Sequence, residues 1–325
     1  MDISILLATY RRPDMLVRTL ESFCHLTAEE LDWEVIVVDN ADDEDTRQIV
    51  ERFRSVLEVT CLVERKRGKN NALNRGLEGA RGELLIFTDD DVIADPMWLI
   101  EMWEGAARWP DHAVFGGRII PKFDSTRIPI SKKHPFFRGA YVLADWEIDE
   151  GPYDASYVWG PNMAVRAEIF RKGWRFNTDV GPNGGNYIMG SETEFTVRLE
   201  KEGFRSVYLP GSLVFHQIRP EQLKAKWLYG RSFRDGRQKA LWYGRPDVPS
   251  VFGVPRYMIR QLIEARIKRL LYFYDRERAI DFGIKYWNIK GMLYQYWKGL
   301  PETKRVTALP DVSLQIPETL TKNKL

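Results

Sequence analysis

Short apolar segments alternate with helix-length segments over residues 3–89, and this alternation limits the fold more than any other feature of the sequence. The apolar segments are rich in Val, Ile and Leu, as expected for strands that are buried on both faces of a parallel sheet. They are Ile3–Ala8, Glu34–Asp39, Val59–Val63 and Leu84–Thr88. Strands and helices in this order predict an α/β fold, with a mostly parallel, Rossmann-like central sheet and flanking helices.

Polar residues follow the ends of these apolar segments. Thr9 follows the first, Asp39 closes the second, and the basic turn Arg65–Lys69 comes after the third. Three aspartates follow the fourth. Open parallel sheets bind ligands outside the carboxyl ends of their strands. Because the four sites come from separate stretches of the chain, their shared position predicts a ligand site at that edge of the sheet.

The three aspartates, Asp89, Asp90 and Asp91, carry the strongest chemical signal at this edge. Adjacent carboxylates repel one another and are costly to remove from water, and a divalent cation such as Mg²⁺ or Mn²⁺ offsets that cost. Alternate residues of an extended segment share a face, so Asp89 and Asp91 can serve one ion or its diphosphate ligand together. The alternative is a solvated acidic turn that caps the helix expected from Pro96.

Two common nucleotide-binding motifs are missing. The first apolar segment leads into ATYRRP, which lacks the GxGxxG that a dinucleotide pyrophosphate needs, and Gly68-Lys69 lacks the earlier glycine of a phosphate loop. If phosphates bind, a metal and Arg or Lys side chains must meet their charge. The aspartates and the basic turn would supply both.

The alternation of strands and helices stops after the strand expected at Ala113–Ile120. Residues 121–157 are rich in Pro, Lys and aromatic residues and are expected to be mostly loop. The sequence WGPNM follows at Trp159–Met163. Its glycine and asparagine can bring backbone and an amide close to a polyhydroxyl ligand, or they form an ordinary turn.

A glutamate at the start of a later helix is a candidate general base. Ser191 and Glu194 are spaced as a capping box for a helix that runs to about Glu202. Glu192 lies between them at the exposed first turn, where the helix dipole favours the ionised form that a general base requires. A surface charge without a catalytic role explains Glu192 equally well.

His216 follows the short apolar strand Leu213–Phe215, in a half of the chain that is rich in carboxylates. Imidazole is a common metal ligand, but an isolated histidine is more often structural. Its position alone leaves both roles open.

The net charge of +2 hides an asymmetry between two parts of the chain. Residues 1–218 carry 26 Lys and Arg against 36 Asp and Glu, or −10, whereas residues 219–305 carry 20 against 8, or +12. We therefore expect an acidic body at 1–218, a basic, aromatic-rich helical extension at 219–305 and an extended tail at 306–325. The apolar stripe of the extension, bordered by Arg and Lys, favours contact with a membrane surface. Packing on the catalytic domain or across a homodimer is the alternative.

Composition, cysteine content and the absence of long apolar runs indicate the class of protein and its cellular compartment. The composition is globular, with 44% apolar and 29% charged residues. Cys24 and Cys61 lack metal-ligand spacing and fit a reducing compartment. The start of the chain does not read as a signal peptide, and no apolar run is long enough to cross a bilayer. We expect a cytoplasmic protein, peripheral at the inner face of the cell membrane, with no nucleic-acid partner because no binding motif is recognised.

Taken together, these stretches resemble the family 2 inverting glycosyltransferases of GT-A fold. The resemblance covers roughly Ile3–Gln217, and its order and spacing are more specific than any single segment. The matching segments are ILLATYRRPDMLVRTLESF, EVIVVDNADDEDT, RGKNNALNRGLEGARGELLIFTDDDV, WGPNMAVRAEIF, GSETEF and VFHQI.

The resemblance implies roles for the matching positions. Asp89 and Asp91 correspond to the family's DxD motif, with Asp91 as the direct metal ligand and Asp89 nearer the ribose or the metal shell. His216 corresponds to a later metal-contacting histidine, and the metal would be Mn²⁺ or Mg²⁺. Glu192 corresponds to the general base, with Glu194 as a secondary candidate. The implied substrate-binding residues are Ala8, Thr9, Tyr10, Arg11, Asp39, Arg67, Lys69, Asn74, Asp89, Asp90, Trp159, Gly160, Asn162, Met163 and Glu194.

One departure from the family pattern concerns the base. The family usually has Glu-Asp where this chain has Ser191-Glu192, so the base is one methylene longer and lacks its acidic neighbour. The implied reaction is a metal-assisted single displacement that moves a hexose from a nucleoside-diphosphate sugar, by default a UDP-sugar, to a hydroxyl of a saccharide or lipid-linked saccharide in polysaccharide biosynthesis. The alternatives are a sugar-phosphate nucleotidyltransferase and a non-catalytic nucleotide-sugar-binding protein at a membrane.

Overall fold

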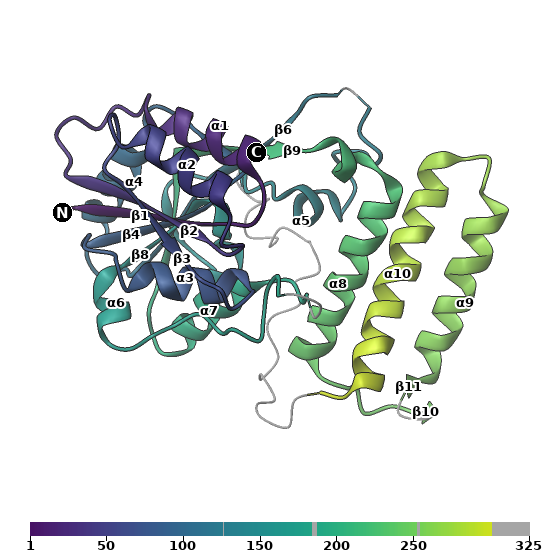
Figure 1. The fold of residues 1–325 in the computed structure, drawn as a ribbon. Helices are drawn as coiled ribbons and strands as arrows, with labels where there is room; N and C mark the ends of the chain where they lie inside the picture. The colour runs from purple at the N-terminus through teal and green to yellow at the C-terminus, as the bar shows by residue number, and fades with distance from the viewer. Residues whose placement is uncertain (126, 184–186, 252–253, 301–325) are drawn as a thin grey trace. The chain divides into compact units, whose positions relative to one another are not determined.

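The computed structural model describes residues 1–125, 127–183, 187–251 and 254–300 (Figure 1). The chain divides into two units, one of residues 1–122 and 142–217, the other of residues 123–141 and of the chain from residue 218 onward. The domain limits expected at residues 218 and 305 stay predictions. The expected tail at 306–325 lies outside the described residues.

Four parallel strands form one half of the sheet in the first unit. They are β1 (Ile3–Thr9), β2 (Trp33–Asp39), β3 (Val59–Val63) and β4 (Leu84–Asp89). Their order in space is β3-β2-β1-β4, with every neighbouring pair parallel. The apolar segments of the sequence therefore became strands where they were expected, within one or two residues. This agreement confirms the predicted α/β class.

Helices cover both faces of the sheet. Ile3, Ile5 and Leu7 of β1 share a core with α1, α2 and α4, whereas Leu6 shares a second core with α3, α6 and α7. This alternation follows from the twofold period of a strand. The helices are α1 (Pro13–Phe23), α2 (Glu44–Phe53), α3 (Lys69–Leu77), α4 (Trp98–Arg108), α6 (Ala167–Arg171) and α7 (Ser191–Lys201).

The other half of the sheet is antiparallel. Strand β8 pairs with β4 and β6, and β9 pairs with β5 and β7. The strands are β5 (Val92–Ala94), β6 (Val114–Phe123), β7 (Gly151–Tyr153), β8 (Met163–Arg166) and β9 (Ser206–Ile218). Two short 3₁₀ helices, η1 (Ala155–Tyr157) and η2 (Gly160–Asn162), precede β8. Strand β9 is much longer than the segment Leu213–Phe215 that the sequence predicted, because it begins at Ser206 and continues through Pro210-Gly211.

A buried carboxylate ties the amino ends of the strands together. Glu34 on β2 accepts a hydrogen bond from Ser4 Oγ on β1 at 2.7 Å. The guanidinium of Arg81, before β4, donates to Glu34 from Nε at 3.1 Å and from Nη2 at 2.7 Å. Burial raises the pKa of Glu34, but the hydrogen bonds from Arg81 and Ser4 outweigh it and hold this pKa below its ordinary value.

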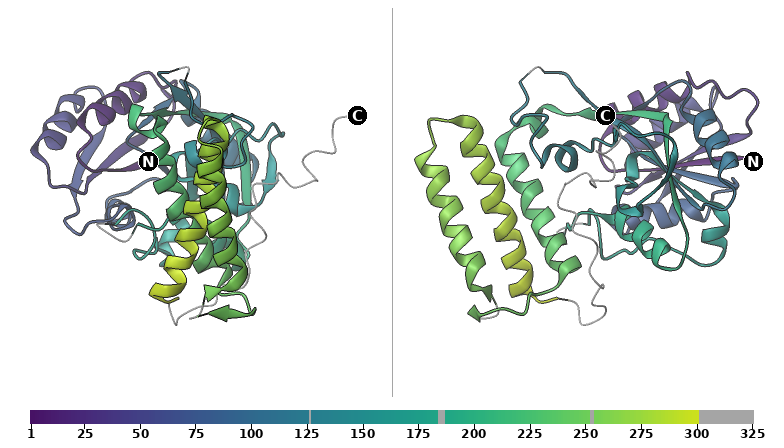
Figure 2. Two further views of the ribbon diagram at one scale, coloured as in Figure 1. Left: turned by 90° about the vertical axis from the view of Figure 1, so that its right-hand side faces the viewer. Right: turned by 180° about the vertical axis from the view of Figure 1, so that it is seen from behind.

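The second unit is mainly helical, as the sequence predicted. Its elements are α5 (Phe137–Tyr141), η3 (Pro220–Leu223), α8 (Ala225–Tyr243), β10 (Ser250–Val251), β11 (Val254–Pro255), α9 (Arg256–Leu271) and α10 (Arg276–Lys298). Helix α10 lies between α8 and α9 in Figure 1 and in the right-hand view of Figure 2. Gly236 of α8 and Gly291 of α10 allow close packing, because a Cβ on either would lie 2.0 Å from a carbonyl oxygen of the other helix. Among the described residues, no helix combines the length and apolarity that crossing a membrane requires.

Candidate functional site

The carboxyl ends of β1, β2 and β4 lie side by side at one edge of the sheet. Strand register places Thr9 opposite Asp39 and Ala8 opposite Asp89. The basic turn after β3 reaches the same edge through Asn40, whose Nδ2 donates to the carbonyls of Glu64 and Lys66 at 2.7 and 2.9 Å. The four polar stretches that the sequence placed at strand ends thus meet in space.

The carboxylate of Asp90 is buried and is held by residues of β1 and of the start of α1. It accepts hydrogen bonds from Thr9 Oγ1 at 2.7 Å and from Arg12 Nη1 at 2.9 Å. Burial, reinforced by the charges of Asp91 and Asp89, raises the pKa of Asp90 to about 6 although Arg12 opposes the shift. Asp90 therefore anchors the aspartate segment to β1 and to the start of α1.

Arg12 is a site residue that the sequence analysis missed. Pro13 is the first residue of α1, so Arg12 occupies the N-cap position, where its side chain makes no capping hydrogen bond. Its Nη1 lies 2.9 Å from Asp90 and 3.3 Å from Asp91. Arg11, which the sequence favoured, has a left-handed backbone with φ 53° and is exposed. The available signal was an arginine directly before a helix-starting proline, in the turn that follows the strand next to β4.

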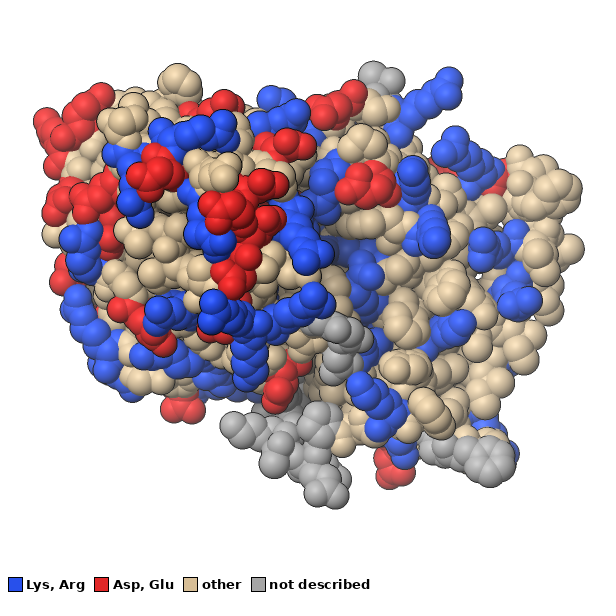
Figure 3. Space-filling view, in the orientation of Figure 1, with Lys and Arg blue, Asp and Glu red and all other residues tan. Residues whose placement is uncertain are grey.

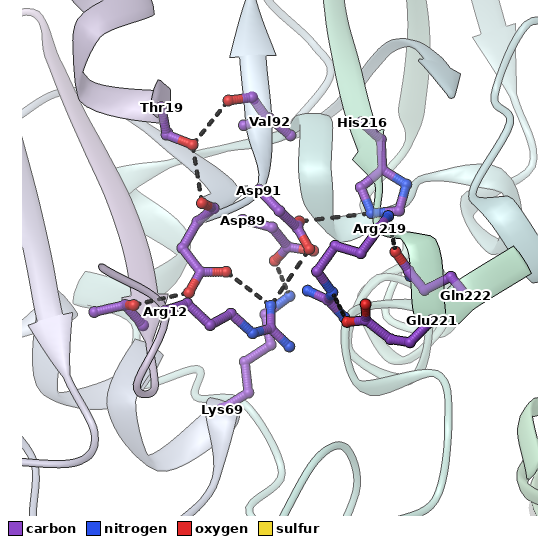
Figure 4. Close-up of polar contacts among 12 residues, drawn as sticks. Arg12, Thr19, Lys69, Asp89, Asp91, Val92, His216, Arg219, Glu221 and Gln222 are labelled. Carbon is purple, nitrogen blue, oxygen red and sulfur yellow. Dashed lines mark hydrogen bonds and ion pairs between the residues drawn. The ribbon is translucent and has the colours of Figure 1, made fainter. Parts of the chain in front are cut away.

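His216 reaches the aspartates through strand pairing. Val92 of β5, directly after Asp91, pairs with His216 of β9. The Nε2 atom of His216 lies 3.5 Å from Asp91 Oδ1, and both side chains are buried. Figure 4 shows the imidazole directed at Asp91, with the carboxylate of Asp89 beside it. Two residues that lie 125 positions apart in the sequence thus form one buried pair.

Lys69 connects the aspartates with the candidate base. At the start of α3, its ammonium forms ion pairs with Asp89 and, at 2.5 Å, with Glu192 Oε1. Burial lowers the pKa of Lys69, but the two carboxylates outweigh it, so this pKa lies above its ordinary value. Burial alone would raise the pKa of Asp89, but the charge and the hydrogen bond of Lys69 outweigh burial and hold this pKa below its ordinary value. Lys69 is therefore charged and joins β4 to α7.

The surroundings of Glu192 differ from those that the sequence predicted. Helix α7 begins after Gly190, whose backbone is left-handed, and no side chain caps it, so the predicted capping box is wrong. Ser191 instead donates a hydrogen bond to Glu192, and Glu194 pairs with Arg198 one turn on. The side chain of Glu192 is only 12% exposed, because Lys69 draws it inward. The prediction of an exposed first turn is thus also wrong.

Gly160 makes room for the carboxylate of Glu192. A Cβ at Gly160 would lie 2.4 Å from Glu192 Oε1 and 2.5 Å from its Cδ. The loop that carries Gly160 is tied to the end of β4 by a hydrogen bond of 2.8 Å from Thr88 Oγ1 to the carbonyl of Pro161. The glycine of WGPNM thus sits against the candidate base.

Charge and donor chemistry at this cluster suit a dication. Asp89, Asp90, Asp91 and Glu192 supply four carboxylates against the two cations Arg12 and Lys69, which leaves an excess of two negative charges. Carboxylate oxygens and imidazole are ligands that Mn²⁺ accepts, and Mg²⁺ prefers the oxygens. Within the described part of the chain, no three His, Cys, Asp or Glu side chains are arranged as a metal site. The residues fit a dication in charge and in donor type, and Asp91 and His216 offer a carboxylate and an imidazole 3.5 Å apart.

A basic and aromatic rim lies next to the strand ends. Tyr10 is 38% exposed, and the guanidinium of Arg67 lies 5.5 Å from its ring centroid. Gly68 has a φ of 137°, which lets the turn approach Asn40. The backbone N–H of Gly68 donates a hydrogen bond to Asn40 Oδ1 at 2.7 Å. Asn40 is a second positioning residue that the sequence analysis missed.

Several predicted substrate-binding residues have their polar groups engaged within the protein. Asp39 accepts from the backbone N–H groups of Ala41 and Asp43 at 2.8 and 2.6 Å. Asn74 donates to and accepts from the backbone of Phe176, at 2.9 Å each way.

Hydrogen bonds within the protein also hold the loop Trp159–Met163. Asn162 is fully buried, accepting from Trp98 Nε1 at 2.8 Å and donating to the carbonyls of Arg118 and Ser212. Met163 is fully buried in β8, and Trp159 donates to the carbonyl of Ser156. The side chains of Asn162 and Met163 thus hold the loop in place, and their contact with a ligand stays a prediction.

Comparison with known proteins gives a family match over half of the chain. The family model described as "Glycosyl transferase family 2" matches residues 4–174. A glucosyl-dolichyl phosphate glucuronosyltransferase of Haloferax volcanii is 24% identical over 310 residues, covering 88% of this chain and 96% of that relative.

Two solved structures share the fold. The mannosyltransferase PcManGT of Pyrobaculum calidifontis, in complex with GDP-Man and Mn²⁺, has a TM-score of 0.59 at 17% identity, with coverage of 91% of this chain and 87% of that one. TarS 1–349 of S. aureus, in complex with UDP, has a TM-score of 0.54 at 16% identity, with coverage of 91% and 92%.

Proposed function

This chain belongs to glycosyl transferase family 2 and is a glycosyltransferase of GT-A fold, and we propose that it moves a sugar from a nucleoside-diphosphate sugar to an acceptor hydroxyl with inversion of the anomeric centre. One observation carries the proposal: Lys69 holds the candidate base Glu192 and the first aspartate of the DxD motif within one buried cluster. A base and a diphosphate site must be close neighbours for a single displacement.

The donor nucleotide lies across the strand ends in this proposal. Thr9 and Asp39 face the ribose and base, with Ala8 beneath them, and Tyr10, Arg11 and Arg67 supply an aromatic and cationic rim for a planar base. Lys69 meets the diphosphate. A uridine nucleotide is our first candidate, and the UDP held by TarS supports it, whereas the GDP-Man of PcManGT makes guanosine the next donor to test.

Asp91 and His216 would hold a divalent cation, Mn²⁺ or Mg²⁺, with Asp89 in its outer shell. When bound, the cation neutralises the charge that develops on the leaving diphosphate. The excess negative charge of the cluster and the short reach from His216 to Asp91 support this assignment. Arg12 keeps Asp90 and Asp91 in place from the opposite side.

Glu192 acts as the general base. An acceptor hydroxyl is a poor nucleophile at neutral pH, so Glu192 takes its proton as the oxygen attacks the anomeric carbon. The new carbon–oxygen bond forms on one face while the bond to the diphosphate breaks on the other, which inverts the centre. Gly160 leaves the carboxylate space to face the acceptor, and Asn162 fixes the loop that carries Gly160.

The acceptor is proposed to be a lipid-linked saccharide or a saccharide of a growing glycan. The Haloferax volcanii relative is named for a glucosyl-dolichyl phosphate substrate, and it aligns over nearly its whole length. A lipid-linked acceptor is reached at a membrane, so we infer a peripheral location at the inner face of the cell membrane.

The test is turnover of candidate nucleotide sugars by the wild type and by Glu192→Gln. Loss of a general base is expected to reduce turnover by about 10²- to 10⁴-fold, with donor binding retained. The released product should be a nucleoside diphosphate, because pyrophosphate would indicate nucleotidyl transfer. Near-normal turnover by Glu192→Gln would place the base elsewhere, and Glu194→Gln then becomes the next variant to measure.

A further inference from the structure

Helix α9 forms one side of the helical layer in the second unit. It packs against α10 through one face, which buries Met258 and Ala265. Helix α8 lies on the far side of α10, so α9 has a helical neighbour on only one side among the described residues of this unit (Figure 2). The described helices of this unit thus leave uncovered the face of α9 opposite Met258 and Ala265.

That uncovered face carries large apolar side chains. Ile263, Ile267 and Leu270 follow helical spacing along it, and Leu271 and the turn after the helix continue the patch. Each of the six side chains has at least half of its surface exposed, from 50% for Ile267 to 79% for Phe273. They are Ile263, Ile267, Leu270, Leu271, Phe273 and Tyr274. Single exposed apolar residues are ordinary, but a contiguous patch marks a surface that another molecule covers.

Cations accompany this patch. Arg256 and Arg260 precede Ile263 and Ile267 on the same helical stripe, so they face the same way. Helix α9 has five Arg and Lys residues and one glutamate, Glu264, which pairs with Lys268 at 2.5 Å. On the face that Figure 3 presents, Lys and Arg lie among uncharged atoms over the second unit and little acidic surface is visible.

We propose that this α9 face, from Arg256 to Tyr274, docks on an anionic lipid bilayer. A helix with apolar residues on one side and bordering cations lies in the plane of a membrane interface, and exposed aromatic rings suit the headgroup depth. Arg256 and Arg260 meet lipid phosphates, while Leu270, Leu271 and Phe273 enter the boundary with the acyl chains.

Charge argues against a second copy of this chain as the occupant. Pairing two α9 faces would bring together two helices that each carry an excess of four positive charges after Glu264 is counted. An anionic bilayer instead supplies the opposite charge and an apolar layer together. The inference concerns a surface outside the donor site and does not need the transferase proposal to be correct.

The experiment is vesicle flotation of the full chain without donor or acceptor. Vesicles of phosphatidylcholine are compared with vesicles of phosphatidylcholine and phosphatidylglycerol, at low and high salt. The apolar variant carries Leu270→Ser, Leu271→Ser, Phe273→Ser and Tyr274→Ser, and the charge variant carries Arg256→Gln and Arg260→Gln. The control carries Val56→Ser and Met97→Ser, two exposed apolar residues of the first unit. Circular dichroism melting confirms that each variant folds.

We expect the wild type and the control to float with the anionic vesicles, and salt to weaken this binding. The charge variant should lose about tenfold or more in affinity, since each cation near the surface contributes about 1 kcal/mol. The apolar variant should lose at least as much. Absence of wild-type binding at low salt, or equal binding by the folded apolar variant, overturns the proposal. A dimer that the apolar variant converts to monomer, with no vesicle binding, assigns the face to a second copy instead.

Discussion

Lys69 bridges two carboxylates that have different proposed tasks. Its ammonium pairs with Asp89 at the end of β4 and with Glu192 at the start of α7. Without Lys69 the cluster would hold four carboxylates against Arg12 alone, an excess of three negative charges. A partly buried lysine in this position stabilises the donor-free protein. It still leaves an excess of negative charge that a dication can neutralise.

Lys69→Met is expected to lower stability and to raise the response to metal. We expect a loss of about 2 kcal/mol, below the range for a fully buried pair because Lys69 retains some exposure. Saturating Mn²⁺ should raise the melting temperature of the variant more than that of the wild type, because the unbalanced charge is larger. Differential scanning fluorimetry measures both effects. Lys66→Met, an exposed change in the same turn, is the matched control and should melt like the wild type.

Gly160→Ala tests the contact with Glu192. The added Cβ would overlap the carboxylate, so the base must move by about 1 Å or more. We expect turnover to fall by about 10²-fold with donor affinity nearly unchanged. Steady-state kinetics and donor titration separate the two. Gly139→Ala serves as the control, because a Cβ added at Gly139 has no neighbour within 4 Å. Unchanged turnover by a folded Gly160→Ala variant would show that Glu192 does not need its present position.

At the scale of elements, strand pairing explains what the sequence could and could not predict. The apolar segments of β1 to β4 predicted the strands and their carboxyl-end cluster, because burial on both faces imposes a continuous apolar run. The partnership of Asp91 with His216 depends on the antiparallel register of β5 and β9, which no local pattern encodes. The sequence named both residues but gave no physical reason for them to meet.

The start of α7 shows a second limit of local patterns. Ser191 and Glu194 have capping-box spacing, yet the helix begins after Gly190 and Ser191 turns to Glu192. The attraction of Lys69, which comes from α3, exceeds what a local cap contributes. The contacts of Asn162 could not be predicted for a related reason, because its three partners lie on separate elements distant in sequence.

The carboxylate that ties β1 and β2 gives a pH prediction. Because the pKa of Glu34 is depressed in the folded protein, its contribution to stability is complete above the unfolded value of about 4.3 and is lost as the pH falls through the folded value. Glu34→Gln should therefore cost about 1–2 kcal/mol at pH 7, and this difference should shrink below pH 4. Urea denaturation at several pH values measures it. A difference that stays constant from pH 7 to pH 3 would contradict the assignment of Glu34 as an ionised partner of Arg81.

At the scale of the whole molecule, the charge asymmetry of the sequence follows the two units. The acidic balance lies in the part that holds the carboxylate cluster, and the basic balance lies in the part that holds α8, α9 and α10. Acidic charge repels a nucleotide diphosphate unless a cation is present, while basic charge favours an anionic surface. The two units are thus suited to different partners, and their functions can be tested separately.

Calorimetric titration of UDP and GDP into the Glu192→Gln variant, with and without Mn²⁺, tests the central claim most directly. The account predicts measurable binding of one nucleoside diphosphate only with the cation, and loss of this dependence in a variant that also carries Asp91→Asn and His216→Ala. Equal affinity with and without Mn²⁺, or cation-dependent binding that survives both substitutions, would contradict it.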